Sequence, residues 1–164
     1  MKLDVLVFAA HPDDAELNLG GTICELVNQH KKVGVIDLTK GEMGTRGTPE
    51  TRQQEVDLAT EVMGIHYREN LDLGDSLLLN TRENQLKIIA EVRKTKPTVC
   101  ITGAPHDRHP DHGKSTQLVL DALFYSGLRR IEIDGTEPWR PKHILHYMQD
   151  RPFEPDFVFD ISKT

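Results

Sequence analysis

The sequence predicts an α/β fold in which a doubly wound, mainly parallel, Rossmann-like sheet has helices on both faces. Short apolar runs alternate along the 164 residues with longer stretches in which apolar side chains recur at helical spacing. The strand-like runs are almost wholly apolar, which is typical of parallel strands buried on both faces. This order of elements implies right-handed crossovers that return each strand to one sheet. A chain of this length is expected to form one domain.

The first half of the chain supplies three expected strands and two expected helices. Residues 3–10 are a near-continuous apolar run, and residues 16–30 continue with apolar positions three or four residues apart. Residues 33–39 predict the second strand. A glycine-rich loop then leads to a helix over residues 49–64, which opens with proline and ends with glycine, as helices commonly do. A short third strand is expected near residues 65–72.

The second half continues the alternation. A helix is expected over residues 81–97, because a threonine can cap its start and a proline stops it. Residues 98–103 predict the fourth strand, and residues 113–127 the next helix. Two further strand-like runs, residues 144–148 and 157–161, close the chain.

Charge and composition exclude several classes of protein. The chain has 20 basic and 26 acidic residues and a formal net charge of −6. It has no cluster of lysine or arginine that could form a basic surface for nucleic acid or an anionic membrane, so neither is expected as a partner. No segment approaches the roughly 18 apolar residues of a spanning helix. The first apolar run is too short for a secretion signal, and Cys24 and Cys100 are expected as reduced thiols rather than as a disulfide or a reactive thiol. We therefore expect a cytoplasmic protein.

Two loops rich in histidine and aspartate follow the first and the fourth expected strands. The first loop spans residues 11–14 and the second spans residues 106–112. In an open sheet of order 3-2-1-4-5, strands 1 and 4 are neighbours where the order reverses, and ligands bind outside their carboxyl ends. The topology is therefore expected to bring the two loops face to face.

Together the loops offer the side chains of a catalytic zinc site, in which three protein ligands leave one position open. The side chains that we assign as metal ligands are His11, Asp14 and His112. Asp13 stands beside a ligand and remains free to act as a general base. His109 and Asp111 form a second histidine–carboxylate pair that we expect in the same cleft.

Each loop also has a plainer interpretation. Asp13 alone could cap the helix that follows it, with Glu16 completing a variant of the capping box. His109 and His112, taken alone, are more often solvated loop residues than ligands. The coincidence of two such loops at adjoining strand ends favours a metal site, and capping by Asp13 is compatible with it. His106 is left open, and the four remaining histidines have no assigned role.

The two loops resemble the paired signatures of the LmbE-like, or PIG-L, zinc-dependent de-N-acetylases. The resemblance lies in residues 10–16, Ala-His-Pro-Asp-Asp-Ala-Glu, and in residues 109–112, His-Pro-Asp-His. Similarity to the bacillithiol-biosynthesis branch, which acts on N-acetylglucosaminyl malate, extends over residues 37–48, Arg52, Glu55, 68–71, 138–141 and 157–162. Family members usually continue for several dozen residues further. We therefore expect residues 1–164 to be a single LmbE-like domain that lacks the usual C-terminal portion.

The resemblance implies a homo-oligomeric hydrolase, hexameric in the family, with one Zn²⁺ per chain and an N-acetylglucosaminide as its small-molecule substrate. Bound zinc lowers the pKa of a water molecule and polarises a carbonyl. Asp13 would take the proton of the attacking water. His109, as an imidazolium oriented by Asp111, would stabilise the tetrahedral oxyanion. Either Asp13 or His109 would then protonate the leaving amine.

A malate-bearing substrate also needs a cation for its carboxylates, and arginine pairs with them through two parallel hydrogen bonds. Arg108 lies inside the second loop and Arg52 follows the glycine-rich loop, so both are assigned to substrate binding. Alternatively, Arg52 is an exposed helix residue paired with Glu55 or another acid, and Arg108 is a loop charge.

Two other functions remain open. A different metal-dependent hydrolase, a phosphoesterase or an amidase, would activate water in the same way. A phosphoesterase usually needs two metals, however, and a second metal here would consume the proposed base. The chain could instead be a truncated, non-catalytic zinc-binding module, although spare acid–base groups exceed what a structural site needs. No G-x-G-x-x-G follows the first strand, which argues against dinucleotide binding.

Overall fold

The computed structural model describes residues 1–133 and 135–164, and in this part of the chain five strands form one parallel sheet of order β3-β2-β1-β4-β5. The strands are β1 (Val5–Ala9), β2 (Val33–Asp37), β3 (Tyr67–Asn70), β4 (Val99–Gly103) and β5 (His143–Tyr147). The helices are α1 (Asp14–Asn28), α2 (Pro49–Val62), α3 (Arg82–Thr95) and α4 (Pro110–Ser126). The predicted fold class and strand order are therefore confirmed.

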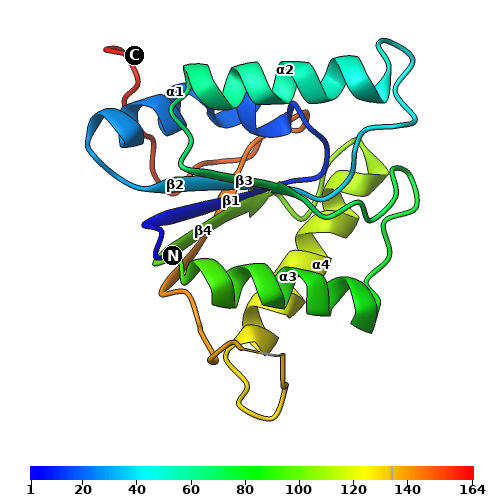
Figure 1. Cartoon of the computed structure of the whole chain (residues 1–164). Coiled ribbons are helices and arrows are strands. Elements are labelled where there is room, and N and C mark those ends of the chain that lie inside the picture. Colours follow the sequence, from blue (N-terminus) through cyan, green and yellow to red (C-terminus); the bar gives the residue numbers. More distant parts are fainter. Residues whose placement is uncertain (134) are drawn as a thin grey trace.

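The helices cover the sheet in pairs, α1 and α2 on one face and α3 and α4 on the other (Figure 1). Each face has its own hydrophobic core. Phe8 of β1 belongs to the core shared with Ile88 of α3 and Leu118 of α4, whereas Val7 belongs to the core shared with Ile23 of α1. Neighbouring residues of one strand thus enter opposite cores, which explains why the central strand β1 is apolar and buried throughout.

Capping residues place two of the helices where the sequence predicts them. Thr48 caps α2, its hydroxyl accepting the backbone N–H of Thr51, and a proline occupies the first turn. Thr81 caps α3 by accepting the N–H of Asn84. No residue of α2 is buried, so this helix is the one least embedded in the fold.

Two elements differ from the prediction. Helix α4 begins at Pro110, earlier than expected, because His109 caps it and proline suits a first turn. The predicted strand over residues 157–161 is wrong. These residues lie in an exposed segment that pairs with none of the described strands, and Val158 is 83% exposed. A short apolar run becomes a strand only where a partner strand supplies hydrogen bonds.

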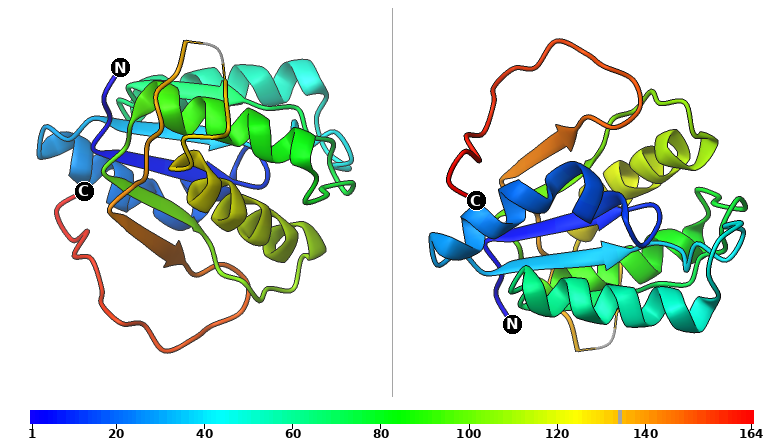
Figure 2. Two further views of the ribbon diagram at one scale, coloured as in Figure 1. Left: turned by 90° about the horizontal axis from the view of Figure 1, so that it is seen from below. Right: turned by 90° about the horizontal axis from the view of Figure 1, so that it is seen from above.

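The segment after β5 leaves the sheet, forms a wide loop and ends beside α1 (Figure 2). There Ile161 packs so closely on Gly21 that a Cβ at that position would come 2.7 Å from its Cδ1. This segment begins at the edge of the candidate site, as described below.

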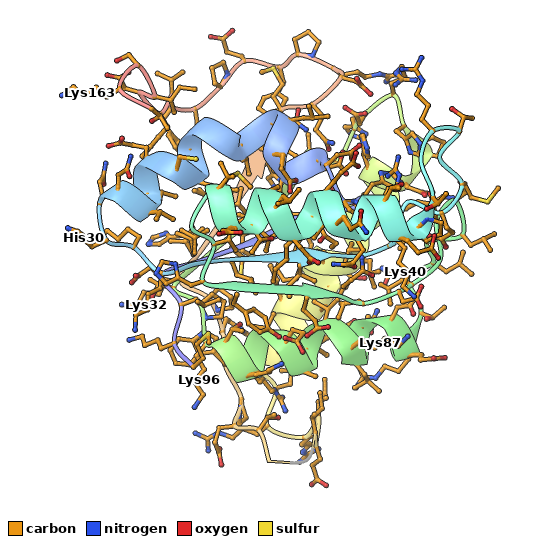
Figure 3. The ribbon with its side chains drawn as sticks, turned by 45° about the horizontal axis from the view of Figure 1, so that its top comes forward. His30, Lys32, Lys40, Lys87, Lys96 and Lys163 are labelled. Carbon is orange, nitrogen blue, oxygen red and sulfur yellow. The ribbon has the colours of Figure 1, made fainter. Side chains whose placement is uncertain are left out.

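The lysines labelled in Figure 3 lie far apart around the molecule. Among the described residues, no helix combines the length and hydrophobicity needed to span a bilayer. Both cysteines are free, and burial raises the pKa of the Cys100 thiol well above its usual value.

Candidate metal centre

The candidate site lies at the carboxyl ends of the strands, where β1 and β4 are neighbours. His11 follows β1 and Asp14 opens α1, whereas Asp111 and His112 stand in the first turn of α4. Because β1 pairs with β4, the two loops meet as expected. The ring centroids of His11 and His112 are 5.6 Å apart, and each lies 4.9 Å from the ring of His109.

The carboxylate of Asp14 lies between the two imidazoles. Its Oδ2 is 3.5 Å from His11 Nδ1, and its Oδ1 is 3.4 Å from His112 Nε2. The backbone N–H of His11 also donates to Oδ2, at 2.9 Å. Two ligand atoms of a tetrahedral zinc site, with bonds of about 2.0–2.2 Å, lie about 3.3 Å apart. Each imidazole thus lies about that far from one oxygen of Asp14, and His11, His109 and His112 offer ring nitrogens that lie within 4.8 Å of one another.

The other nitrogen of each imidazole contacts a buried carboxylate. His11 Nε2 is 3.2 Å from Asp75 Oδ1 and 3.5 Å from Asp111 Oδ2, and His112 Nδ1 is 2.9 Å from Asp107 Oδ1. A carboxylate accepts only, so with a metal bound these nitrogens would donate, which would leave Nδ1 of His11 and Nε2 of His112 to hold the metal. Histidines that bind metals are usually oriented by a carboxylate in this way.

The centre holds more negative than positive charge. The side chains of Asp14, Asp75, Asp107 and Asp111 are each at most 8% exposed. Even with both imidazoles protonated, the four carboxylates leave an excess of negative charge, because Lys114 approaches Asp111 only from the surface, at 3.8 Å. A buried excess of one sign is costly unless it is compensated. A divalent cation would supply that compensation.

The same charges shift the pKa values of the assigned ligands. Burial alone would lower the pKa of His11, but Asp14 and two further carboxylates outweigh burial and raise it to about 9. The pKa of His112 is also raised, against burial, by its carboxylate partners. Burial would raise the pKa of Asp14, yet the two imidazoles hold it well below its usual range. The electrostatics of the centre thus favour positive charge between these groups.

A cavity of about 380 Å³ opens onto the assigned ligands, and Asp13 is among the residues that line it. Asp13 occupies the N-cap position of α1, but its side chain makes no capping hydrogen bond. Glu16 pairs with Arg68 instead of completing a capping box. The capping role considered for Asp13 is therefore absent. Burial, together with the charge of Asp14, raises the pKa of Asp13.

His109 also lines this cavity, but the expected pairing of its ring with the Asp111 carboxylate is not formed. His109 Nδ1 accepts the backbone N–H of Asp111 at 3.2 Å, which leaves Nε2 to carry the ring proton. The Asp111 carboxylate accepts the N–H of Ser76 at 2.7 Å and faces His11. The first turn of α4 directs this side chain towards the loop after β3, so it supports a different histidine.

Of the two arginines assigned to substrate binding, only Arg52 lies at the cavity. Its guanidinium rests against the glycine-rich loop, where a Cβ on Gly41 or Gly44 would collide with it. Arg108 does not line the cavity: its side chain is 71% exposed and pairs with Asp150, at the cavity edge, at 3.0 Å. The structure therefore brings Arg52 to the site and leaves Arg108 outside it.

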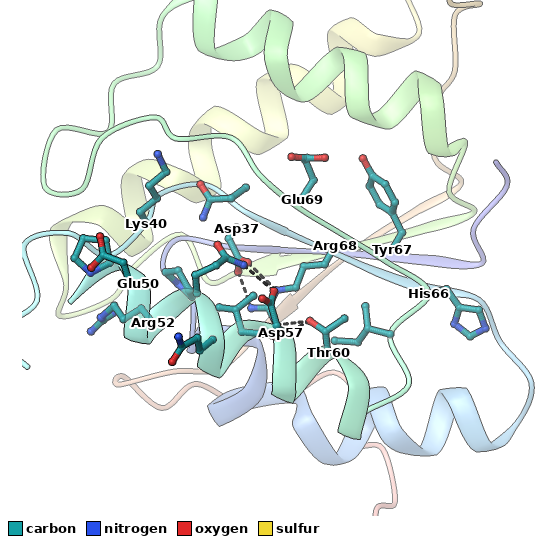
Figure 4. A pocket seen from close by; sticks show the side chains of 17 residues that line it. Asp37, Lys40, Glu50, Arg52, Asp57, Thr60, His66, Tyr67, Arg68 and Glu69 are labelled. Carbon is teal, nitrogen blue, oxygen red and sulfur yellow. Dashed lines mark hydrogen bonds and ion pairs between the residues drawn. The ribbon is translucent and has the colours of Figure 1, made fainter. Parts of the chain in front are cut away.

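A second, larger cavity of about 820 Å³ lies between α2 and β3 (Figure 4). Arg68 lines it, but its guanidinium is neutralised by contacts with Asp37 and Glu16. Arg52 stands between the two cavities and lines both. The assigned ligands line only the smaller cavity, so the larger one is not where the metal chemistry would occur.

Three residues of the centre escaped the sequence analysis. Asp107 and Asp75 orient the imidazoles, and Asp75 also accepts a backbone N–H of the glycine-rich loop at 2.9 Å. Gln149 donates from Nε2 to Asp14 Oδ1 at 2.9 Å. Asp75, Asp107 and Gln149 each follow the carboxyl end of a strand. Their place just after a strand is the signal in the sequence that could have identified them, since ligands bind at the carboxyl ends of parallel strands.

A family model for PIG-L, described as GlcNAc-PI de-N-acetylase, matches residues 6–123, which include both histidine–aspartate loops. The chain belongs to the PIG-L family. The metal centre assembled from β1, α1 and α4 thus falls within the part of the chain that PIG-L proteins share.

Known proteins similar to this PIG-L chain include two deacetylases. Diacetylchitobiose deacetylase of Thermococcus kodakarensis is 30% identical over 172 residues, covering 96% of this chain and 63% of the relative. The 1D-myo-inositol 2-acetamido-2-deoxy-alpha-D-glucopyranoside deacetylase of Thermobispora bispora is 24% identical, covering 90% and 59%. The chain therefore spans about three fifths of the length of these curated relatives.

A solved structure confirms the fold. The conserved protein TT1542 from Thermus thermophilus superposes with a TM-score of 0.93 and is 40% identical, covering 98% of this chain and 72% of that chain. The parallel sheet and its four helices are thus an arrangement known in a similar protein.

Proposed function

We propose that this PIG-L chain is a zinc-dependent hydrolase that removes the acetyl group from an N-acetylglucosaminide. The observation that carries the proposal is one cavity lined by His11, Asp14 and His112, in which Asp14 lies within 3.5 Å of both imidazoles, together with the carboxylate of Asp13. The curated relatives support the reaction class, since one is named for diacetylchitobiose and the other for an inositol 2-acetamido-2-deoxyglucopyranoside.

His11, Asp14 and His112 would hold one zinc ion per chain. Two imidazole nitrogens and one carboxylate are a usual ligand set for a catalytic zinc ion, and three protein ligands leave one position open. Zinc, when bound, lowers the pKa of a water molecule and polarises the amide carbonyl. One metal per chain also distinguishes this reaction from a two-metal phosphoesterase.

Asp13 would act as the general base. It takes a proton from the water as the water oxygen bonds to the carbonyl carbon, and its raised pKa makes it a better base than an ordinary aspartate. It then returns the proton to the amide nitrogen as the C–N bond breaks. The second proton of the water also passes to the amine as the acetate carboxyl group ionises, so the products are acetate and an ammonium group, and atoms and charge balance.

His109 would stabilise the oxyanion as a neutral donor. Its Nδ1 is occupied by a backbone N–H, so the proton on Nε2 is the one available to the carbonyl oxygen. This assignment replaces the imidazolium expected from the sequence. Asp111 supports His11 and takes no direct part in the reaction.

We further propose N-acetylglucosaminyl malate as the substrate, as the resemblance to the bacillithiol branch implies. Arg52 carries this part of the proposal, because its planar guanidinium at the cavity can pair with a malate carboxylate. Arg108 is not included, since it pairs with Asp150.

Comparison of Arg52→Ala with Arg52→Lys on two substrates tests the role of Arg52. The alanine variant should raise KM for N-acetylglucosaminyl malate by about 10-fold or more, since a charged hydrogen bond contributes about 1.5–3 kcal/mol. It should leave KM for plain N-acetylglucosamine nearly unchanged, and lysine should restore part of the loss. Equal effects on both substrates would remove the carboxylate-binding role.

A further inference from the structure

We propose that Gln149 is a positioning residue of the metal centre: it holds the Asp14 carboxylate towards His112, in a space that Gly103 leaves open. No motif pointed to Gln149, which follows β5 at the edge of the sheet. The inference rests on the metal-binding role proposed above for Asp14 and His112.

The contacts of Asp14 show what Gln149 contributes. The two carboxylate oxygens are held by different donors: Oδ2 accepts the backbone N–H of His11 at 2.9 Å, and Oδ1 accepts Nε2 of Gln149 at 2.9 Å. Without Gln149, one side of the carboxylate would lose its hydrogen-bond donor. Gln149 therefore fixes the oxygen that faces His112.

The amide nitrogen of Gln149 also lies beside His112. It is 3.4 Å from His112 Nε2, the nitrogen that would bind the metal, whereas His112 Nδ1 contacts Asp107. A zinc ion bound to His112 Nε2 would take the place of this contact and leave Nε2 of Gln149 donating to Asp14 Oδ1. With the amide reversed, its carbonyl oxygen would meet the Asp14 carboxylate, so the network selects the observed orientation.

The backbone next to Gln149 is linked to His112 through Asp107, which contacts the other ring nitrogen of this histidine. Asp107 Oδ2 accepts the N–H of Asp150 at 3.1 Å and that of Arg151 at 3.3 Å, while its Oδ1 contacts His112 Nδ1. The chain after β5 is thus anchored to the centre by its backbone. This anchor leaves the Gln149 side chain little freedom to move away from Asp14.

Gly103 provides the space for the Gln149 carboxamide. It ends β4 and pairs with Tyr147 of β5, two residues before Gln149. A Cβ at Gly103 would come 2.9 Å from Gln149 Oε1 and 3.5 Å from Thr116 Oγ1. An alanine at this position should therefore push the carboxamide away from Asp14 without altering Gln149 itself.

The test compares zinc dissociation constants, measured by chelator competition, for the wild type, Gln149→Ala, Gly103→Ala and the double variant. Each single variant should weaken zinc binding by about 10–100-fold, as is usual when a partner of a metal ligand is removed. The double variant should bind no more weakly than Gln149→Ala, because both changes remove the same contact. Gln117→Ala, which removes a similar Gln–Asp hydrogen bond on α4, should bind zinc like the wild type.

Three results are informative in different ways. If the wild type binds no zinc, the proposed function fails first. If it binds zinc and Gln149→Ala binds zinc equally or more tightly, the positioning role of Gln149 is overturned. Additive losses in the double variant would contradict the role given to Gly103. Gln149→Met keeps the volume but removes the donor, so it repeats the test should the alanine variant be poorly folded.

Discussion

Single aspartates decide the chemistry of this centre by the partners that they contact. Asp14, Asp75 and Asp107 each hydrogen-bond or face an imidazole, whereas Asp13 lines the cavity and makes no capping bond to its helix. Neighbouring residues of one loop thus have different environments. The difference supports the proposed roles, in which Asp14 would bind the metal and Asp13 would transfer the proton.

Replacing Asp13 with asparagine should separate proton transfer from metal binding. The variant keeps the shape of the side chain but cannot accept a proton, so kcat should fall by about 10²–10⁴-fold. Zinc content should stay at the wild-type level, since the three ligands are untouched. Steady-state kinetics and metal analysis check the two expectations. A kcat close to that of the wild type would show that Asp13 is not the base.

Replacing Asp75 with asparagine should weaken metal binding. Both of its oxygens accept from donors, Oδ1 from His11 Nε2 and Oδ2 from the N–H of Met43, and a carboxamide has only one acceptor oxygen. One donor therefore loses its partner, and zinc affinity should fall by about 10–100-fold. Asp72→Asn, at an exposed position three residues earlier, is the control. Equal zinc affinity in the two variants would show that Asp75 does not support metal binding.

At the scale of elements, Arg68 joins β3 to two neighbours. Its guanidinium donates to Asp37 of β2 at 2.8 and 3.1 Å and also contacts Glu16 of α1. The Arg68 side chain is 6% exposed and that of Asp37 is 1% exposed. Among the described strands this edge strand pairs with β2 alone, and it is thus held by a buried ion pair as well as by the hydrogen bonds to β2.

Changing Arg68 to methionine should lower the free energy of unfolding by about 3–5 kcal/mol, because it leaves the buried Asp37 carboxylate uncompensated. Urea denaturation measures the change. Lys40→Met breaks a pair with Asp72 in which both side chains are more than half exposed, and it should cost less than about 1 kcal/mol. Similar losses in the two variants would contradict the difference in burial.

The elements were predictable because local signals and topology agree. Apolar runs predict β1, β2, β4 and β5, and the caps at Thr48 and Thr81 mark helix starts that the structure contains. The predicted strand at residues 157–161 failed because apolar content does not report whether a partner strand is present. Helix α4 began early because the cap is His109, which the general preference for serine, threonine and aspartate does not predict.

Of the candidate site, only the part that follows from the order of the strands was predictable. The adjacency of β1 and β4 brings together the loops of His11 and His112, and this meeting follows from strand order. The contacts of Asp75 and Gln149 depend on the conformation of loops after β3 and β5, which no periodic signal describes. The outward direction of Arg108 likewise follows from its local pairing with Asp150.

At the scale of the whole molecule, the two hydrophobic cores do not depend on the metal centre. The cores pack the strands against α1 on one face and against α3 and α4 on the other, and none of the assigned ligands belongs to them. A chain of this size can bury enough surface without a structural metal. The fold should therefore persist when zinc is removed.

Chelation should leave the far-UV circular dichroism unchanged while abolishing activity. Zinc added back should raise Tm by mass action, equivalent to about 2.7 kcal/mol at a free concentration 100 times Kd. Thermal scans across a zinc titration measure this shift. Unfolding on chelation would instead identify a structural zinc site, as a non-catalytic module would have.

The central claim, a one-zinc de-N-acetylase, is tested most directly by titrating metal-free protein with zinc while measuring free amine released from N-acetylglucosaminyl malate and from N-acetylglucosamine. The account predicts that amine release rises linearly to one zinc per chain and then stops rising. It also predicts that Asp13→Asn binds the same zinc without comparable turnover. Full binding of one zinc by the wild type with no amine released from either substrate would contradict the account.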